Sequence, residues 1–327
     1  MRLGKIVVDR DIPFLDGVFE PWFEVVLLSG GAVRPADVRD AVALVVRTRT
    51  RCDAALLDGS SVQLIATATI GTDHIDLAYC ASRGIAVASA PGCNAAAVAQ
   101  YVAVALRTLR LDRPGATLGV IGVGHVGRRV AEAGLRAGMR VLLSDPPREA
   151  LEGPAGFSPL PELLASADVV TLHIPLWREN LDFADAGFFA AMRPGAAFIN
   201  ASRGEVVDEE ALLSARGRLG RLVLDVWKNE PAINLQLLAA ADIATPHIAG
   251  YSVQGKIGGT QSVVRAVGEC FSIHPLKDFR VEGVTLPQTP YDILADDKAL
   301  RSDPSAFESL RSHYNYRNEK MPGRSRA

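Results

Sequence analysis

Features typical of membrane, secreted and nucleic-acid-binding proteins are missing from this sequence. No stretch approaches the roughly 18 uncharged apolar residues that a membrane-spanning helix needs. The first apolar run, IVV at 6–8, is far too short for the core of a secretion signal, and an aspartate follows it. The net charge is only −2, so no nucleic acid and no membrane surface is expected as a partner.

Cysteine is also scarce. The four cysteines, Cys52, Cys80, Cys93 and Cys270, are scattered along the chain and form no CxxC pair. This spacing disfavours a metal site or a disulfide framework and favours reduced thiols in a cytoplasmic protein. No metal is therefore expected, and the predicted location is the cytoplasm.

The composition is that of a folded protein with a large core. Of the 327 residues, 48% are apolar and 22% are charged, which excludes a disordered chain. The length fits about two domains of roughly 150 residues each.

Short β-branched segments alternate with longer helical patterns, in two successive sets. Continuous apolar strands separated by helices are typical of parallel sheets buried on both faces. The pattern therefore predicts an α/β protein with two doubly wound parallel-sheet domains. The expected strands lie at 5–9, 23–28, 43–47, 62–69, 85–90, 117–122, 140–145, 169–174, 196–201, 221–226 and 243–248.

A glycine-rich turn, TLGVIGVGHVG, joins an expected strand to a helix at the start of the second set. In that context Gly122 makes a tight turn, Gly124 lets the backbone approach a pyrophosphate, and Gly127 lets helix and strand pack closely. Asp145 ends the next strand, where a carboxylate binds ribose hydroxyls and repels a 2′-phosphate. NAD is therefore expected rather than NADP, although the nearby Arg148 weakens that choice. The alternative is a glycine turn without a ligand.

Further polar side chains follow the last three expected strands. Arg203 follows the first, Asp225 and Glu230 the second, and His247 lies at the end of the third. Carboxyl ends of parallel strands meet at one edge of a sheet, where α/β proteins bind ligands. A lone histidine after a strand is more often structural, and Glu230 before a proline could be a solvated acid. Their combination downstream of a dinucleotide loop favours a proton-transfer site.

With these residues the chain resembles the D-isomer-specific 2-hydroxyacid dehydrogenases, from about residue 40 to about residue 275. Within that family the closest likeness is to the erythronate-4-phosphate dehydrogenase branch. The segments that carry it are ATATIGTDHID (66–76), APGCNAAAVAQYV (90–102), SDPPR (144–148), LDVWKNEP (224–231) and HIAGYSVQGK (247–256).

The resemblance implies a role for each matching position. His247 would be the general acid/base, Glu230 its orienting partner, and Arg203 the group that holds the substrate carboxylate. Substrate contacts are implied for Thr48, Thr69 and Tyr251. Cofactor contacts are expected at Gly122, Gly124, His125, Val126 and Gly127 of the glycine turn, and are implied at Asp145, Ala201, Ser202, Arg203, Asp225 and Gly250.

Elementary chemistry supports these assignments. Oxidation of an alcohol needs a base for the hydroxyl proton, and histidine, with an ordinary pKa near 6.5, suits that role. A carboxylate on the far ring nitrogen fixes the tautomer and stabilises the imidazolium. Arginine grips a carboxylate with two parallel hydrogen bonds, which lysine cannot do.

The segment VVRTRTRCD (45–53) follows an expected strand and carries three arginines. Arg47 precedes the matched Thr48 and is the best candidate to bind a phosphate at the far end of the substrate. The alternative is a solvated cluster of charges.

The resemblance implies an NAD-dependent 2-hydroxyacid dehydrogenase. The expected reaction is oxidation of 4-phospho-D-erythronate at C2 to (R)-3-hydroxy-2-oxo-4-phosphooxybutanoate, in pyridoxal 5′-phosphate (vitamin B6) biosynthesis. One alternative is another D-2-hydroxyacid dehydrogenase, acting on 3-phosphoglycerate or glycerate. The other is a binding protein that senses NAD.

The break in the pattern at Pro91–Gly92 and the polar composition from about residue 281 suggest the domain limits. Residues 1–92 and 256–280 are expected to form a flavodoxin-like substrate-binding domain, and 93–255 a Rossmann NAD-binding domain. Residues 281–327 would be a short C-terminal extension, which could serve as a reduced dimerisation element in a homodimer. One departure from the family pattern is Gln100, where glutamate is usual.

Overall fold

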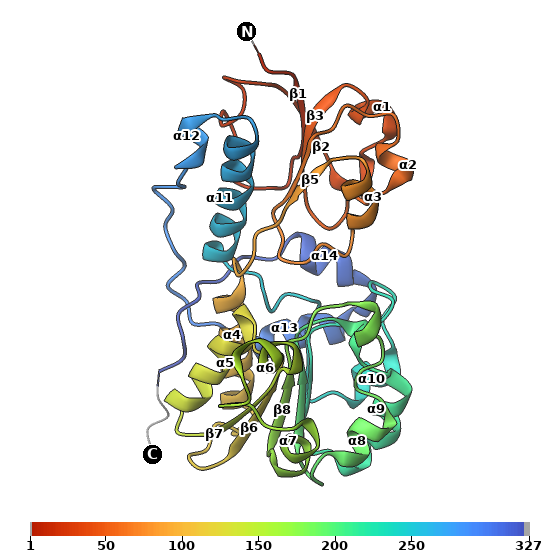
Figure 1. Ribbon diagram of the computed structural model, residues 1–327. Helices are drawn as coiled ribbons and strands as arrows, with labels where there is room; N and C mark the ends of the chain where they lie inside the picture. The colour runs from red at the N-terminus through yellow and green to blue at the C-terminus, as the bar shows by residue number, and fades with distance from the viewer. Residues whose placement is uncertain (1, 324–327) are drawn as a thin grey trace. The chain divides into compact units, whose positions relative to one another are not determined.

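The computed structural model describes residues 2–323 and divides into two compact units, each built on a parallel sheet (Figure 1). Unit 1 contains the chain up to Asn94 together with Val253–Leu286, and unit 2 contains Ala95–Ser252 and the chain from Pro287 onward. The predicted fold class is confirmed. The expected domain limits of 92 and 255 lie close to these changes at 94 and 252, but the segment from Pro287 belongs to unit 2 instead of standing apart as an extension.

Unit 1 has a five-stranded sheet in the order β2-β1-β3-β4-β5, which is the flavodoxin-like order. Every pair in it is parallel. The strands are β1 (Lys5–Asp9), β2 (Glu24–Leu28), β3 (Ala41–Val46), β4 (Leu64–Thr67) and β5 (Ala86–Ala88). The helices are α1 (Pro35–Val38), α2 (Ala54–Leu57), α3 (Leu77–Ser82), α11 (Val253–Cys270) and α12 (His274–Lys277).

This sheet carries apolar side chains on both faces, which explains why helices cover both of them. On one face Val263 and Val267 of α11 pack with Ile6 and Val8 of β1. On the other face the short helices α1, α2 and α3 cover the alternate residues, among them Val7. Burial on both faces is what a continuous apolar strand in a parallel sheet requires.

Unit 2 has a six-stranded parallel sheet in the order β11-β10-β9-β8-β6-β7. The strands are β6 (Thr117–Ile121), β7 (Arg140–Ser144), β8 (Val169–Leu172), β9 (Ala197–Asn200), β10 (Leu222–Leu224) and β11 (Ile243–Ala244). The helices are α4 (Ala95–Thr108), α5 (His125–Arg136), α6 (Pro146–Glu152), α7 (Leu160–Ser166), α8 (Ala186–Ala191), α9 (Glu209–Ala215), α10 (Leu235–Ala240), α13 (Ile293–Ser302) and α14 (Phe307–Ser312). The order of strands reverses at β6, whose neighbours are β7 and β8, so the turn after β6 lies at the switch point where such sheets bind ligands.

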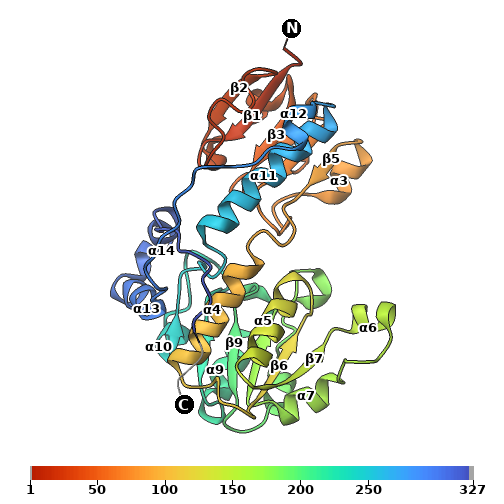
Figure 2. The same cartoon turned by 90° about the vertical axis from the view of Figure 1, so that its left-hand side faces the viewer.

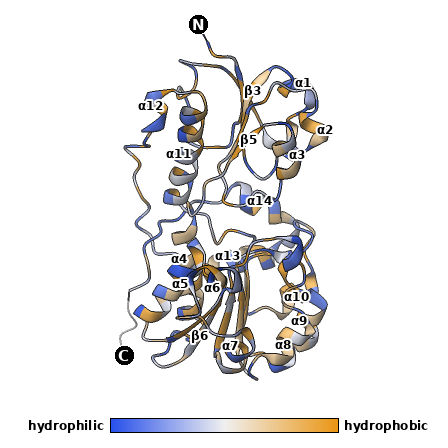
Figure 3. Cartoon of the chain, viewed as in Figure 1, coloured by the Kyte–Doolittle hydropathy of each residue, from blue (hydrophilic) through white to orange (hydrophobic). Residues whose placement is uncertain are grey.

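Helices α4 and α5 pack on one face of the unit 2 sheet (Figures 1 and 2), and α7 to α10 on the other (Figure 1). The strands between them are strongly apolar (Figure 3). The late helices α13 and α14 complete this core, because Leu300 and Phe307 are fully buried in it. No helix in residues 2–323 has both the length and the apolar character needed to cross a membrane.

Aspartate and asparagine side chains set the start of many helices. Each accepts a hydrogen bond from a backbone N–H of the first turn, which an N-terminal cap is expected to do. The residues are Asp53, Asp76, Asp145, Asp185, Asp208, Asn234 and Asp292, which precede α2, α3, α6, α8, α9, α10 and α13.

The turn between β6 and α5 contains three glycines of the predicted motif, and it requires glycine at two of these positions. Gly122 has φ +83°, and a Cβ there would lie 2.6 Å from the carbonyl oxygen of His173. A Cβ at Gly127 would lie 1.9 Å from the carbonyl oxygen of Gly122. A Cβ at Gly124, by contrast, would meet nothing within 4 Å. Gly122 and Gly127 therefore shape the turn, and Gly124 leaves the start of α5 open.

We predict that Gly127→Ala lowers the free energy of unfolding by about 1–3 kcal/mol, because the added methyl must displace backbone atoms. Gly124→Ala is the matched control, since it adds the same methyl in open space and should cost less than about 1 kcal/mol. Urea unfolding followed by circular dichroism measures both variants. Equal losses would contradict the packing role of Gly127.

Candidate active site

The three residues expected to be catalytic follow strands at the carboxyl edge of the unit 2 sheet. Arg203 follows β9, Glu230 follows β10 and His247 follows β11. These three strands are neighbours in the sheet. The structure therefore brings together three segments that are up to 44 residues apart in the sequence.

His247 and Glu230 form a hydrogen-bonded pair. The Nδ1 atom of His247 lies 2.8 Å from Oε2 of Glu230, and Oε1 accepts the backbone N–H of Trp227 at 3.0 Å. Burial alone would raise the pKa of Glu230, but the charge and hydrogen bond of His247, together with the charge of Arg311, lower it below its usual value. Glu230 is therefore ionised near neutral pH, and it holds the imidazole ring by one nitrogen.

The backbone at His247 adopts the left-handed region, with φ 56°, which is unusual for a residue other than glycine. Its N–H donates to the carbonyl oxygen of Asp225 at 2.7 Å. The carboxylate of Asp225 accepts the N–H groups of Ile248 (2.8 Å) and Ala249 (2.9 Å) and the hydroxyl of Thr245 (2.6 Å). Asp225 thus holds the loop on both sides of the histidine.

Asp225 was expected to contact NAD. The side chain is only 1% exposed, and burial raises its pKa despite the groups that stabilise its charge. The structure therefore gives it a role in holding the loop, and the cofactor contact stays a prediction.

Arg203 ends a short turn that Asn200 organises. The buried Asn200 side chain donates to the carbonyl oxygen of Arg203 at 2.8 Å and accepts from the N–H and hydroxyl of Ser202 at 3.0 and 2.8 Å. Next to it, a Cβ at Gly204 would lie 2.0 Å from the backbone of Trp227. This close approach fixes the segment Ala201–Arg203 at the sheet edge. Asn200 was not predicted, because an asparagine at a strand end has many other uses.

The glycine turn and Asp145 fit the adenosine end of NAD. Gly124 caps α5 over open space, which suits a pyrophosphate at a helix N-terminus. Asp145 accepts the N–H groups of Val123 (2.7 Å) and Arg148 (3.1 Å), one on each oxygen, and each oxygen can accept another hydrogen bond. His125 and Val126 form the first turn of α5, and their contact with the cofactor stays a prediction.

Arg148, the residue that weakened the choice of NAD, is engaged elsewhere. Its Nε and a terminal nitrogen contact the two carboxylate oxygens of Glu152 at 2.7 and 2.5 Å, and the other terminal nitrogen donates to the carbonyl oxygen of Val123. Its charge is therefore already compensated, which favours NAD.

Gly250 and Tyr251 continue the loop after His247. The ring of Tyr251 is half-buried and lies edge-on to the rings of Tyr314 and Tyr316, with centroids 5.9 and 6.0 Å away. The predicted contact of Gly250 with NAD and that of Tyr251 with substrate remain predictions.

The remaining predicted substrate residues lie in unit 1. Thr48 is exposed after β3, and Thr69 follows β4, where its hydroxyl donates to the carbonyl oxygen of Gly71 at 3.0 Å. Arg47 differs from the expectation. It contacts Asp9 at 2.9 and 3.3 Å and Asp11 at 2.6 Å. Two carboxylates already compensate its charge, so a phosphate would have to compete with them.

Two arginines near the loop were missed. Arg311 of α14 lies 3.6 Å from Glu230. Arg317 is 6% exposed and donates to the carbonyl oxygens of Ile248 and Tyr251, each at 2.9 Å. Both belong to a polar segment without a recognised motif, and no feature of the sequence links them to His247.

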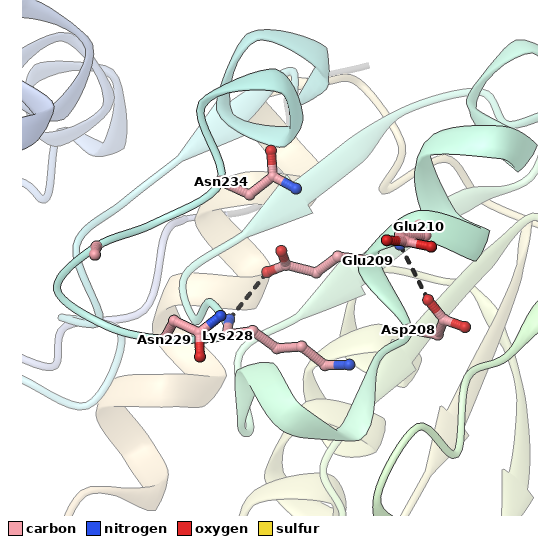
Figure 4. A pocket seen from close by; sticks show the side chains of 7 residues that line it. Asp208, Glu209, Glu210, Lys228, Asn229 and Asn234 are labelled. Carbon is pink, nitrogen blue, oxygen red and sulfur yellow. Dashed lines mark hydrogen bonds between the residues drawn. The ribbon is translucent and has the colours of Figure 1, made fainter.

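A hollow of about 360 Å³ lies beside this edge but contains none of the predicted residues (Figure 4). Two of its acidic side chains accept backbone hydrogen bonds: Asp208 accepts the N–H of Glu210 at 3.0 Å, and Glu209 accepts that of Lys228 at 2.9 Å. Within residues 2–323 no group of three or more His, Cys, Asp or Glu side chains is placed to hold a metal ion. The lining residues are Asp208, Glu209, Glu210, Lys228, Asn229, Ala232 and Asn234.

Comparisons with known proteins agree with this geometry. The family model described as D-isomer specific 2-hydroxyacid dehydrogenase, NAD binding domain, matches residues 95–249. A D-lactate dehydrogenase from Aquifex aeolicus, solved with NAD and lactic acid, superposes with a TM-score of 0.70 at 27% identity, over 86% of this chain and 100% of that one.

Curated relatives extend the match to almost the whole chain. The erythronate-4-phosphate dehydrogenase of Bacteroides fragilis is 42% identical over 96% of this chain and 97% of its own length. That of Azotobacter vinelandii is 42% identical over 96% of this chain and 93% of its own length. The chain therefore belongs to the erythronate-4-phosphate dehydrogenase family, within the NAD-dependent D-isomer-specific 2-hydroxyacid dehydrogenases.

Proposed function

We propose that the protein oxidises 4-phospho-D-erythronate at C2 to (R)-3-hydroxy-2-oxo-4-phosphooxybutanoate with NAD, in pyridoxal 5′-phosphate biosynthesis. The observation that carries the proposal is the pairing of His247 Nδ1 with Glu230 at 2.8 Å, at the edge to which Arg203 also belongs. The relatives that share nearly the full length of the chain support this substrate.

In this proposal His247 takes the proton of the C2 hydroxyl. Because Nδ1 contacts Glu230, Nε2 is the nitrogen that faces the substrate. The ionised Glu230 stabilises the imidazolium that forms, and the C2–H electron pair leaves as hydride. Bound NAD supplies the acceptor for that hydride. In the reverse direction the imidazolium returns the proton to the C2 oxygen.

Arg203 is proposed to grip the substrate carboxylate and to polarise the C2–O bond. The turn held by Asn200 fixes its backbone, which limits the entropy lost when the side chain binds. The proposed NAD contacts are those of the glycine turn, Asp145, the segment Ala201–Arg203, Asp225 and Gly250.

We also propose that the protein acts in the cytoplasm as a homodimer. Cys52, Cys80, Cys93 and Cys270 are all free thiols, which agrees with a reducing compartment. Sedimentation velocity tests the homodimer, and a single species with the mass of one chain would contradict it.

We predict that His247→Ala lowers turnover about 10²–10⁴-fold, because the proton has no acceptor. The affinity for NADH, measured by fluorescence titration, should be nearly unchanged. His274→Ala, at an exposed position on α12, is the control and should keep wild-type turnover.

The assay measures NADH formation with 4-phosphoerythronate, 3-phosphoglycerate and glycerate. Preference for one of the last two would reject the proposed substrate, and near-wild-type turnover of His247→Ala would remove the histidine from the mechanism. NADH binding without turnover of any 2-hydroxy acid would favour the NAD-sensing alternative.

We predict that Arg47 binds the substrate phosphate, in competition with Asp9 and Asp11. Arg47→Ala should then raise the Michaelis constant for 4-phosphoerythronate about tenfold or more and leave that of an unphosphorylated 2-hydroxy acid unchanged, since charge-assisted hydrogen bonds are lost. The same variant should lower stability, because it removes the cation that pairs with the buried carboxylate of Asp9. Equal effects on both Michaelis constants would argue against a phosphate contact.

A further inference from the structure

Helix α14 lies outside the segment matched by the family model and brings an arginine to the proton-transfer pair. A terminal nitrogen of Arg311 lies 3.6 Å from Oε2 of Glu230, the same oxygen that His247 Nδ1 contacts at 2.8 Å. Both side chains are largely buried, with 18% of Arg311 and 17% of Glu230 exposed. The carboxylate oxygen is therefore shared by an imidazole and a guanidinium in a place where water screens their charges poorly.

The segment after α14 is tied to the loop that carries His247. Besides its bonds to Ile248 and Tyr251, Arg317 donates to the carbonyl oxygen of Ala249. Its Nε donates to the side chain of Gln100 at 2.9 Å. These contacts hold the chain just beyond Arg311 against the loop. The backbone that carries Arg311 is therefore held in place, unlike that of an arginine on a mobile surface segment.

Other charged groups surround the pair. Glu308, one turn before Arg311 on α14, lies 3.5 Å from the guanidinium and is 42% exposed. Asp225, at the end of β10, lies beneath the loop and interacts electrostatically with His247. The cation is thus shared between Glu308, which faces solvent, and Glu230, which faces the imidazole.

We propose that Arg311 is a positioning residue for the proton transfer, because it shares Glu230 with His247 and so sets the proton affinity of the imidazole. The inference rests on the proposed role of His247 as the acid/base. Two effects act in one direction. The cation opposes a second positive charge on the imidazole, and it withdraws part of the negative charge of Glu230 that would stabilise the imidazolium. Both effects oppose formation of the imidazolium, so the cation acts in favour of the ring form that accepts a proton during oxidation.

The test is the pH dependence of kcat/KM in Arg311→Met. Without the cation, the imidazole binds its proton more tightly, so the acid limb of the oxidation should move to higher pH by about 0.5–1 pH unit. The alkaline limb of the reverse reaction, which needs the imidazolium, should move in the same direction. Arg311→Lys keeps the cation and should bring both limbs back towards wild type.

Glu308→Gln is the matched control on the same helix. It removes the competing carboxylate and leaves Arg311 with Glu230, so the limbs should stay in place or move to lower pH. An upward movement in Glu308→Gln as large as that in Arg311→Met would mean that any change on α14 has this effect, and would overturn the proposal. A fall in kcat/KM at every pH without movement of the limbs in Arg311→Met would do so too.

A second measurement separates this proposal from the proposed function. The titration of the His247 ring, followed by NMR and assigned with His247→Ala, needs no substrate. An increase in its pKa in Arg311→Met supports the role of Arg311 even if 4-phosphoerythronate is not the substrate. An unchanged pKa overturns it even if the substrate is correct.

Discussion

The buried carboxylate of Asp225 is the constraint on which the candidate site depends. His247 takes a left-handed conformation in the loop that follows β11, which is unusual for a residue other than glycine. Such a conformation persists only where the surroundings determine it. Here one carboxylate accepts two N–H groups and a hydroxyl from the same loop, and the carbonyl of the same residue accepts the N–H of His247. The loop is therefore held in the conformation in which the imidazole contacts Glu230.

Charge compensation decides which arginines are available for ligands. Arg47 and Arg148 both follow strands at positions suited to phosphate recognition, and in sequence both look like anion-binding residues. The structure gives Arg47 two aspartates and Arg148 a glutamate one turn further along its helix. A guanidinium that is already paired with a carboxylate attracts an incoming anion less strongly. The acids near each arginine therefore help to determine whether it can bind a phosphate.

Periodicity and glycine chemistry predicted most of the fold and much of the candidate site. Each of the 11 strands in the two sheets falls within or overlaps an expected segment, because buried parallel strands are short, apolar and bounded by turns. The glycine turn could be predicted because the steric requirements for glycine there involve only a few neighbouring residues. The rule that neighbouring strand ends meet predicted that Arg203, Glu230 and His247 share one edge, and the resemblance implied the pairing of His247 with Glu230. Arg311 and Arg317 could not be predicted this way, since their contacts with Glu230, the histidine loop and Gln100 join segments 66 to 217 residues apart and depend on how a polar segment docks. Gln100, a departure from the family pattern, accepts a hydrogen bond from Arg317 that its position in the sequence did not predict.

The contacts of Arg317 have a consequence for the biogenesis of the protein. A ribosome releases the chain from its N-terminus, so the whole unit 2 sheet is synthesised before Arg317 emerges. Until then the carbonyl groups of the histidine loop lack the hydrogen bonds that the guanidinium will later donate. Competence for catalysis would therefore be acquired only once Arg317 has been added, after all strands of unit 2 have been synthesised.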